Sequence, residues 1–261
     1  MRLTVAAAVL TPFVWLRSGG EIMRLGRRPL VLCMLSGILL AAHFWAWITS
    51  LEYTSVASST ALVTTNPLWV ALVSAVVLRE HPGAAGLAGI VLTLVGSMLV
   101  FAADASRAAT AGTAPNLGNA LALLGAISAS GYLLIGRTLR LHISLSAYIW
   151  LAYTAAAVLL AGAALATDKA LMSLPWSAWM FMVALGLGPQ LIGHTSLNWA
   201  LRRLTATFVA VAILGEPIGA AILAWFFFSE AFTPVQLVGF FILLSGIFVA
   251  ARAEKLRAIE T

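Results

Sequence analysis

The chain has 261 residues, of which 62% are hydrophobic and only 9% are charged, and its mean hydropathy is +1.01. A soluble domain carries roughly 25% charged residues, so the composition indicates a polytopic membrane protein and excludes secreted, cytosolic globular and nucleic-acid-binding classes. The net charge of +6 would suggest nucleic acid in a soluble chain, but here the basic residues lie between apolar runs. The single cysteine, Cys33, excludes an intramolecular disulfide and a cysteine metal site.

Apolar segments of membrane-spanning length follow one another along the chain. A transmembrane helix needs about 20 residues to cross ~30 Å of hydrocarbon, and solid apolar runs indicate helices rather than the alternating strands of a β-barrel. The longest connections are a basic segment at 17–29 and a loop of small residues at 104–116. We predict nine spans, at residues 3–16, 30–51, 54–78, 85–103, 117–136, 144–166, 176–199, 204–228 and 234–251.

Basic residues divide unevenly between the two sets of loops. One set holds 12 Lys and Arg residues, and the other holds only Arg2, Arg107 and Lys169. Because loops rich in Lys and Arg stay in the cytoplasm, we predict a multi-pass cell-membrane protein with a cytoplasmic C-terminus and Met1 outside.

The chain matches itself at an offset of 150 residues without a gap. The prediction is a first repeat at 1–103, a linking loop at 104–116, a second repeat at 117–251 and a cytoplasmic tail at 252–261. The matched positions include Pro67 with Pro217, Gly89 with Gly239, and Gly96 with Gly246.

The repeat also predicts the number and direction of the helices. The span at 117–136 has no counterpart in the first repeat, so ten helices are expected where nine are present. A late start site, a fragment or a divergent protein would each account for the difference. With five helices per repeat, the second repeat enters from the opposite face. The predicted fold class is an all-α polytopic membrane protein of two inverted five-helix repeats that lacks the first helix of repeat one.

Inverted repeats with interrupted helices are typical of secondary transporters, whose site lies at the midplane between the repeats. Pro67 and Pro217 fall near the middle of their spans. Each lacks an N–H group and displaces the carbonyl four residues earlier. We therefore predict helix breaks that line a cavity and take part in gating, with simple packing kinks as the alternative.

Glu216 is the only formal charge deep inside a span. A charge at the bilayer centre costs about 2.5–3.5 kcal/mol on insertion scales, so such residues usually face a cavity. Glu216 is a candidate for substrate binding or for loading and releasing a proton, and its repeat counterpart is the neutral Asn66. A protonated or hydrogen-bonded glutamate that holds helices together is the alternative.

The span at 176–199 carries a polar stripe. Gln190, His194 and Asn198 are spaced four residues apart, which puts them on one face of a helix and predicts a surface that faces a cavity. The first repeat offers His43 with Trp47 four residues on, and Trp47 could stack on a flat substrate, although packing is the common role of such aromatics. Tyr132 and Tyr148 are weaker candidates, because aromatic residues at span ends are usually interfacial.

No constellation typical of catalysis is present. The sequence contains no HExxH, no paired intramembrane aspartates and no CxxC motif. We therefore expect no enzyme activity, no catalytic residue, no metal site and no cofactor.

The run Leu214-Gly215-Glu216-Pro217 resembles the closing pattern of EamA-type repeats in the drug/metabolite transporter superfamily. Asn66-Pro67 is similar to the version in the first repeat. The resemblance implies a ten-helix bundle with cytoplasmic termini that carries small metabolites through a central cavity, commonly outward. The second-repeat pattern continues through Glu230, Thr233-Pro234, Gln236, Gly239 and Gly246, and the first-repeat version through Glu80 and Gly89.

The predicted function is a secondary transporter that exports a small metabolite, such as an amino acid or another amphipathic compound, by alternating access. Coupling to protons through Glu216 is left open, as are a passive channel or facilitator and a non-transporting truncated membrane component. The expected partners are the lipid bilayer, a small-molecule substrate and protons, with no nucleic acid.

Overall fold

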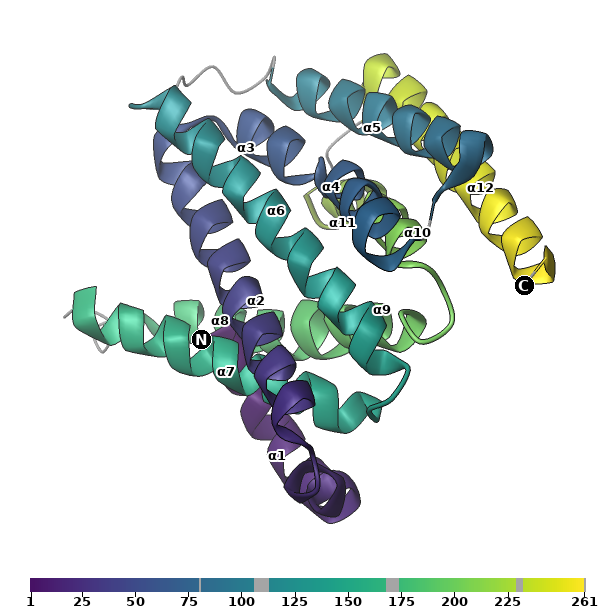
Figure 1. The fold of residues 1–261 in the computed structure, drawn as a ribbon. Helices are drawn as coiled ribbons and strands as arrows, with labels where there is room; N and C mark the ends of the chain where they lie inside the picture. The colour runs from purple at the N-terminus through teal and green to yellow at the C-terminus, as the bar shows by residue number, and fades with distance from the viewer. Residues whose placement is uncertain (80, 106–112, 168–173, 229–231, 261) are drawn as a thin grey trace. The chain divides into compact units, whose positions relative to one another are not determined.

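The computed structural model describes residues 1–79, 81–105, 113–167, 174–228 and 232–260, and within them it is helical and contains no strand (Figure 1). Eight of its helical stretches have the length and apolar composition needed to cross a membrane. The elements are α1 (Arg2–Met23), α2 (Arg27–Tyr53), α3 (Val56–Val63), α4 (Asn66–Val73), the π-helix η1 (Ser74–Leu78), α5 (Gly83–Ala105), α6 (Pro115–Arg140), α7 (Leu145–Thr167), α8 (Trp176–Leu185), the π-helix η3 (Gly186–His194), α9 (Thr195–Ala200), α10 (Ala206–Ile213), α11 (Glu216–Phe228) and α12 (Pro234–Glu260).

The seventh predicted span, at 176–199, is not among these eight stretches and corresponds to α8, η3 and α9, which follow one another without an intervening loop. The fold class of an all-helical polytopic membrane protein is therefore confirmed. Of the predicted linking loop at 104–116, residues 106–112, which include Arg107, lie outside the described residues. The same is true of Glu80, Lys169 and Glu230.

The prediction of a long connection at 17–29 is wrong. Helix α1 continues to Met23, and only residues 24–26 separate it from α2. Arg is a good helix former, so the charges in this segment do not end the helix. Ser18 and Gly19 are buried, and the Glu21 carboxylate accepts a hydrogen bond from the backbone N–H of Ser144 at 2.8 Å. The segment is therefore an ordered end of α1.

Contacts divide the chain into two compact units. The first unit comprises residues 1–45 and 131–203, and the second comprises 46–130 and 204–261. Each unit therefore combines segments from both predicted repeats. The core of the first unit includes the fully buried Leu40, Tyr148 and Tyr153, and that of the second includes Ile90 and Leu214.

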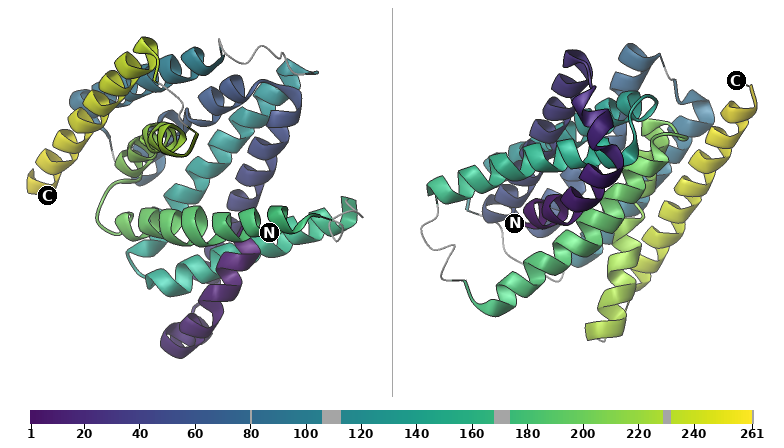
Figure 2. Two further views of the ribbon diagram at one scale, coloured as in Figure 1. Left: turned by 180° about the vertical axis from the view of Figure 1, so that it is seen from behind. Right: turned by 90° about the horizontal axis from the view of Figure 1, so that it is seen from below.

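Helices α5 and α12 of the second unit lie side by side and antiparallel (Figures 1 and 2). Glycines allow their backbones to approach closely. A Cβ atom at Gly89 would lie 2.9 Å from Cβ of Ala250, and one at Gly239 would lie 2.8 Å from Cγ2 of Val100. The two pairs are equivalent by the repeat, because Gly239 lies 150 residues after Gly89 and Ala250 lies 150 residues after Val100. Reciprocal contacts of this kind are what a local two-fold axis produces, and an antiparallel pair related in this way has inverted topology.

The second unit also contains two interrupted helices at equivalent positions. Helices α3 and α10 begin 150 residues apart, and so do α4 and α11. The chain turns between the members of each pair, where Thr65 N–H donates to the Leu62 carbonyl at 3.2 Å and Gly215 N–H donates to the Ala212 carbonyl at 3.0 Å. Pro67 and Pro217 each occupy the second residue of the helix that follows the turn, a position that needs no intrahelical N–H bond.

Candidate functional site

The segment that carries the polar stripe is wound as a π-helix. Element η3 contains Gly188, Pro189 and Gly193, and proline removes a backbone donor while glycine has a low α-helix preference. Gly186, at its start, packs so closely on α1 that a Cβ atom would lie 2.9 Å from the carbonyl oxygen of Arg2. Element η3 has nine residues and lies between two α-helical segments, and π-helical insertions in α-helices frequently occur at functional sites.

The stripe contributes to a buried polar cluster in the first unit. Gln190 and Asn198 have no exposed surface. The Asn198 side-chain amide donates to the hydroxyl of Tyr132 and, at 2.7 Å, to the His194 carbonyl. It also lies 3.4 Å from the Tyr153 hydroxyl. We call these residues, Gln190, His194, Asn198, Tyr132 and Tyr153, the first-unit polar cluster.

Several polar atoms of this cluster are buried without a hydrogen bond of ordinary length and angle. They are both side-chain amide atoms of Gln190, Oδ1 of Asn198 and Nδ1 of His194, although the Tyr153 hydroxyl lies near the Gln190 amide. Leaving such a group unsatisfied costs about 1–3 kcal/mol, and native proteins contain few of them. The cluster therefore offers several donors and acceptors to a polar ligand or to water.

Aromatic rings and one cation border the cluster. The ring of Phe44 lies 5.6 Å from that of His194 in an edge-on arrangement, and the ring of Tyr132 lies 6.3 Å from it. The guanidinium carbon of Arg2 lies 3.6 Å from the centroid of the Phe44 ring. The predicted candidate His43 is next to these groups, with its ring 4.7 Å from that of Phe44.

Two arginines hold the end of α9 that carries Asn198. Arg140 donates from Nε to the Asn198 carbonyl at 3.1 Å and from Nη1 to the Ile143 carbonyl. Arg137 donates to the Leu201 carbonyl at 3.0 Å. Cations that bind the last carbonyls of a helix stabilise its C-terminus, so these contacts fix the position of the Asn198 side chain.

The other predicted residues belong to the second unit. Asn66 is buried with no hydrogen bond to its Oδ1, Pro67 is buried and Trp47 is half-buried. Glu216 is the first residue of α11 and is exposed, so its carboxylate lies at a helix N-terminus, where negative charge is favoured. The predicted site residues are therefore divided between the two units. The first unit contains Gln190, His194, Asn198 and His43, and the second contains Asn66, Pro67, Trp47, Glu216 and Pro217.

Sequence reasoning missed three residues that border the first-unit polar cluster, namely Arg2, Phe44 and Tyr153. The sequence analysis places Arg2 in a loop before the first span, where it bears only on the orientation of the spans. The repeat offset contains a signal for its true place, because Arg2 corresponds to Ala152, which lies inside α7. Phe44 and Tyr153 carry no such signal, since apolar and aromatic residues are common throughout the spans.

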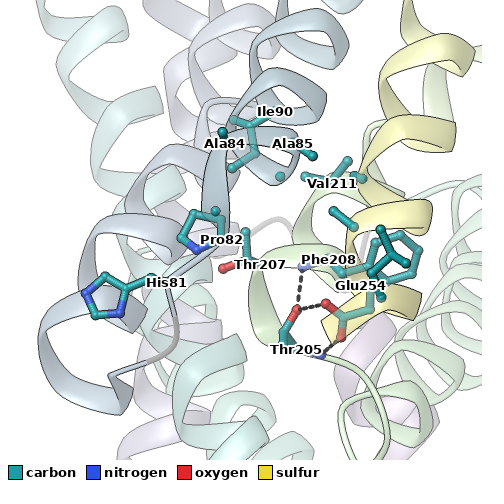
Figure 3. Close-up of a pocket in the computed structure, with 15 residues that line it drawn as sticks. His81, Pro82, Ala84, Ala85, Ile90, Thr205, Thr207, Phe208, Val211 and Glu254 are labelled. Atoms are coloured by element: carbon teal, nitrogen blue, oxygen red, sulfur yellow. Dashed lines mark hydrogen bonds between the residues drawn. The ribbon is translucent and has the colours of Figure 1, made fainter. Parts of the chain in front are cut away.

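A cavity of about 380 Å³ lies elsewhere, within the second unit, where the beginnings of α5 and α10 meet the end of α12 (Figure 3). The Glu254 carboxylate accepts hydrogen bonds from the backbone N–H of Thr205 at 2.6 Å and from its hydroxyl at 2.7 Å. The Thr205 hydroxyl in turn accepts the N–H of Phe208 at 3.2 Å and caps α10. None of the predicted substrate-binding residues lines this cavity.

Among the described residues, no group of His, Cys, Asp and Glu is arranged to hold a metal ion.

Comparison with known proteins identifies relatives of the chain. A model of the EamA-like transporter family matches residues 1–102 and 116–252. A protein of Archaeoglobus fulgidus, described as an uncharacterized transporter, is 25% identical over 75 residues, which are 29% of this chain and 28% of that protein. A solved crystal structure of a protein without a stated function aligns over 97% of this chain and 86% of its own, with a TM-score of 0.80 and 19% identity, and so shares the fold.

Proposed function

Because the chain belongs to the EamA-like transporter family, we propose that it is a secondary transporter that exports a small amphipathic metabolite across the cell membrane. Family membership and the apolar helices make it a multi-pass membrane transporter. The substrate class, the outward direction, the cell membrane as location and a cytoplasmic C-terminus are parts of the proposal.

The first-unit polar cluster is the observation that carries the proposal. Polar residues inside a membrane span are costly and usually face the bundle interior or a water-filled cavity. Here Gln190 is completely buried, and neither of its amide atoms makes an ordinary hydrogen bond. A metabolite that supplies these hydrogen bonds would bind in preference to lipid or to an apolar solute.

The interrupted helices of the second unit support transport by alternating access. Secondary transporters commonly change state through discontinuous helices at equivalent positions of two repeats. The turns before Asn66 and Glu216 are such a pair, and a turn between two short helices can change its backbone angles without breaking a long hydrogen-bonded ladder. We propose that Pro67 and Pro217 keep these turns in place and that the adjoining half-helices move during the cycle.

Counterflow in proteoliposomes tests the proposal, with candidate substrates selected by their thermal stabilisation of the purified protein. A carrier shows trans-stimulation, whereas a passive channel does not. Gln190→Leu should lower the exchange rate strongly because it removes both amide atoms. Ser196→Ala is the matched control, since the Ser196 hydroxyl is exposed and donates to the carbonyl of Ile192, four residues earlier in the chain. Wild-type exchange by Gln190→Leu would contradict the proposed site.

We further propose that Glu216 couples transport to protons. Its carboxylate is the only acid in the span at 204–228, and a gain or loss of its charge would alter the interaction with the N-terminus of α11. Glu216→Gln should abolish the pH dependence of transport while the protein stays folded. Glu52→Gln, which changes an exposed carboxylate at the end of α2, is the control. An unchanged pH dependence in Glu216→Gln would refute proton coupling but not transport.

A further inference from the structure

The cavity in the second unit is formed by three helices and has room for a small molecule. The beginning of α5, the beginning of α10 and the end of α12 line it, and all three belong to this unit (Figure 3). Its volume of about 380 Å³ lies within the range of about 300–1,000 Å³ typical of small-molecule sites. Ala84 and Ala85 are exposed parts of its lining, so a ligand can reach it from outside.

The N-terminus of α5 contributes to the wall of this cavity. The lining residues Pro82 to Gly86 are proline, glycine and alanine, and none of these side chains has a hydrogen-bond acceptor. The first four N–H groups of a helix have no partner within it, and their partial positive charge attracts anions. The small side chains leave this stretch of backbone accessible to a ligand inside the cavity.

The hydroxyl of Thr207 points to a ligand independently. Thr207 is only 8% exposed and lines the cavity, and Figure 3 shows its oxygen turned towards Pro82 at the start of α5. The Thr205 hydroxyl donates to Glu254, whereas the Thr207 hydroxyl forms no hydrogen bond with any described residue. Because buried polar groups normally have a partner, this hydroxyl indicates that a ligand or water completes the site.

Glu254 supplies a negative charge to the same cavity. Each of its carboxylate oxygens accepts one hydrogen bond from Thr205, and a carboxylate has about four acceptor positions. Among the described residues that line the cavity, Glu254 is the only carboxylate, and neither Lys nor Arg is present. Charge complementarity therefore favours a ligand with an ammonium group near Glu254 as well as an anionic group at the start of α5.

Apolar side chains complete the lining. Ile90, Val211 and Ala250 belong to the buried core of the second unit, and Phe208 packs against them. A ligand that fits inside the cavity therefore has an apolar body as well as its two charged groups. A free amino acid combines these parts in one small molecule, whereas the acyl chains of a lipid would extend beyond the cavity.

We propose that this cavity binds a free amino acid with an apolar side chain, at a site separate from the first-unit polar cluster. The carboxylate of the ligand would accept hydrogen bonds from the first N–H groups of α5 and from the Thr207 hydroxyl. Its ammonium group would donate to Glu254, which continues to cap α10, and its side chain would lie against Phe208 and Val211. The inference goes beyond the proposed function, because none of these residues belongs to the proposed transport site.

Three probes of matched shape test the inference: L-leucine, 4-methylpentanoate, which lacks the amine, and 3-methylbutylamine, which lacks the carboxylate. Binding of each to the purified full chain in phosphatidylcholine nanodiscs is measured by calorimetry. L-leucine should bind at least about tenfold more tightly than either of the other probes, because charge-assisted hydrogen bonds are the strong ones. Equal affinity for all three probes, or no binding of L-leucine at millimolar concentration, would overturn the inference.

Variants of the lining separate the two charged contacts. Glu254→Gln should lower the affinity for L-leucine about tenfold and leave that for 4-methylpentanoate unchanged, while its amide oxygen can still accept the Thr205 N–H. Thr207→Val should weaken binding of both carboxylates. Ala85→Asp should abolish binding of L-leucine by repelling its carboxylate, although an acidic residue in the first turn favours folding of α5.

Thr60→Val is the matched control, because the Thr60 hydroxyl donates to the Val56 carbonyl of the same unit and does not line the cavity. It should bind L-leucine as the wild type does. Wild-type affinity in both Glu254→Gln and Ala85→Asp would overturn the inference, and size-exclusion profiles show whether each variant is folded. Loss of L-leucine binding when phosphatidylethanolamine replaces phosphatidylcholine would assign the cavity to a lipid headgroup and also overturn it.

Binding to the purified protein distinguishes this inference from the proposed function. L-leucine binding that is lost in Gln190→Leu and retained in Glu254→Gln would place the ligand in the first-unit polar cluster and overturn the inference. Binding that depends on Glu254 and Thr207 would support the inference even if counterflow showed no exchange and the proposed transport failed.

Discussion

Replacement of Gly96 by alanine should separate α5 from α12 and destabilise the second unit. The added Cβ atom would contact the backbone nitrogen of Leu243 and lie 2.7 Å from both the Gly239 carbonyl oxygen and Cα of Leu243. Favourable contacts between carbon atoms lie at about 3.5–4.0 Å, so the helices must move apart by roughly 1 Å. The opposing atoms belong to a helix backbone and cannot turn aside as a flexible side chain could.

The expected cost follows from this displacement. Overpacking of a close contact costs about 1–3 kcal/mol, and a gap of 0.5–1 Å forfeits roughly a quarter to a half of the dispersion energy of each neighbouring contact. Because the change affects a whole interface between two helices, a value near 3 kcal/mol is expected. Alanine has the better helix propensity and stabilises the helix by about 1 kcal/mol relative to glycine. The net decrease in the free energy of unfolding is therefore about 2 kcal/mol.

The free energy of unfolding in mixed detergent micelles, titrated with SDS, measures this loss. Gly162→Ala is the control, because a Cβ atom at Gly162 of α7 would meet no heavy atom within 4 Å; it should be neutral or slightly stabilising. Gly246→Ala should cost as much as Gly96→Ala, since the repeat offset relates the two positions. If Gly96→Ala proved as stable as Gly162→Ala, the close packing of α5 on α12 would be refuted.

Three hydrogen bonds give further predictions. Tyr148→Phe should lower the free energy of unfolding by about 1–3 kcal/mol, because it leaves the buried Ser36 hydroxyl, 2.6 Å away, without its partner. In a double-mutant cycle, the double variant with Ser36→Ala should recover much of this loss. Additive losses of the two single variants would contradict the contact. Glu254→Ala should cost about 2 kcal/mol and speed hydrogen exchange at the start of α10, whereas unchanged protection of the Thr205 amide would exclude the cap. Glu21→Ala should lower the free energy of unfolding by the ~1 kcal/mol typical of a lost helix cap. An unfolding midpoint equal to that of the wild type would show that the contact contributes nothing.

Composition and apolar length were sufficient to predict the fold class, because the bilayer allows few alternatives to helices with satisfied backbones. The repeat offset predicted that Pro67 and Pro217 occupy equivalent positions in the spans at 54–78 and 204–228, and the helices that contain them, α4 and α11, begin at equivalent residues. The error at 17–29 came from treating charge as a sign of a loop. A charged residue at the end of a span can continue the helix, as Glu21 does when it caps a neighbouring helix.

The candidate site was less accessible to sequence reasoning. The spacing of Gln190, His194 and Asn198 indicated a shared face, but not that the segment from Gly186 to His194 is wound as a π-helix. The repeat offset relates Arg2 to Ala152 of α7 and so indicates that it lies inside a span, but it does not predict the contacts of Arg2 with Phe44 and His194, which lie far away in the sequence. Tertiary contacts of this kind have no local pattern.

The pairing of α5 with α12 also has a consequence for synthesis of the protein. Gly96 and Leu243, which pack together, are separated by 147 residues of chain. At a translation rate of about 5–20 residues per second, α5 waits roughly 7–30 s in the membrane before its partner is made. During that time its glycine-lined face lacks the helix that packs on it in the finished protein. Helix α12, which is made long after α5, therefore completes their pairing in the second unit, and a chain that stops before α12 would leave α5 without its main partner.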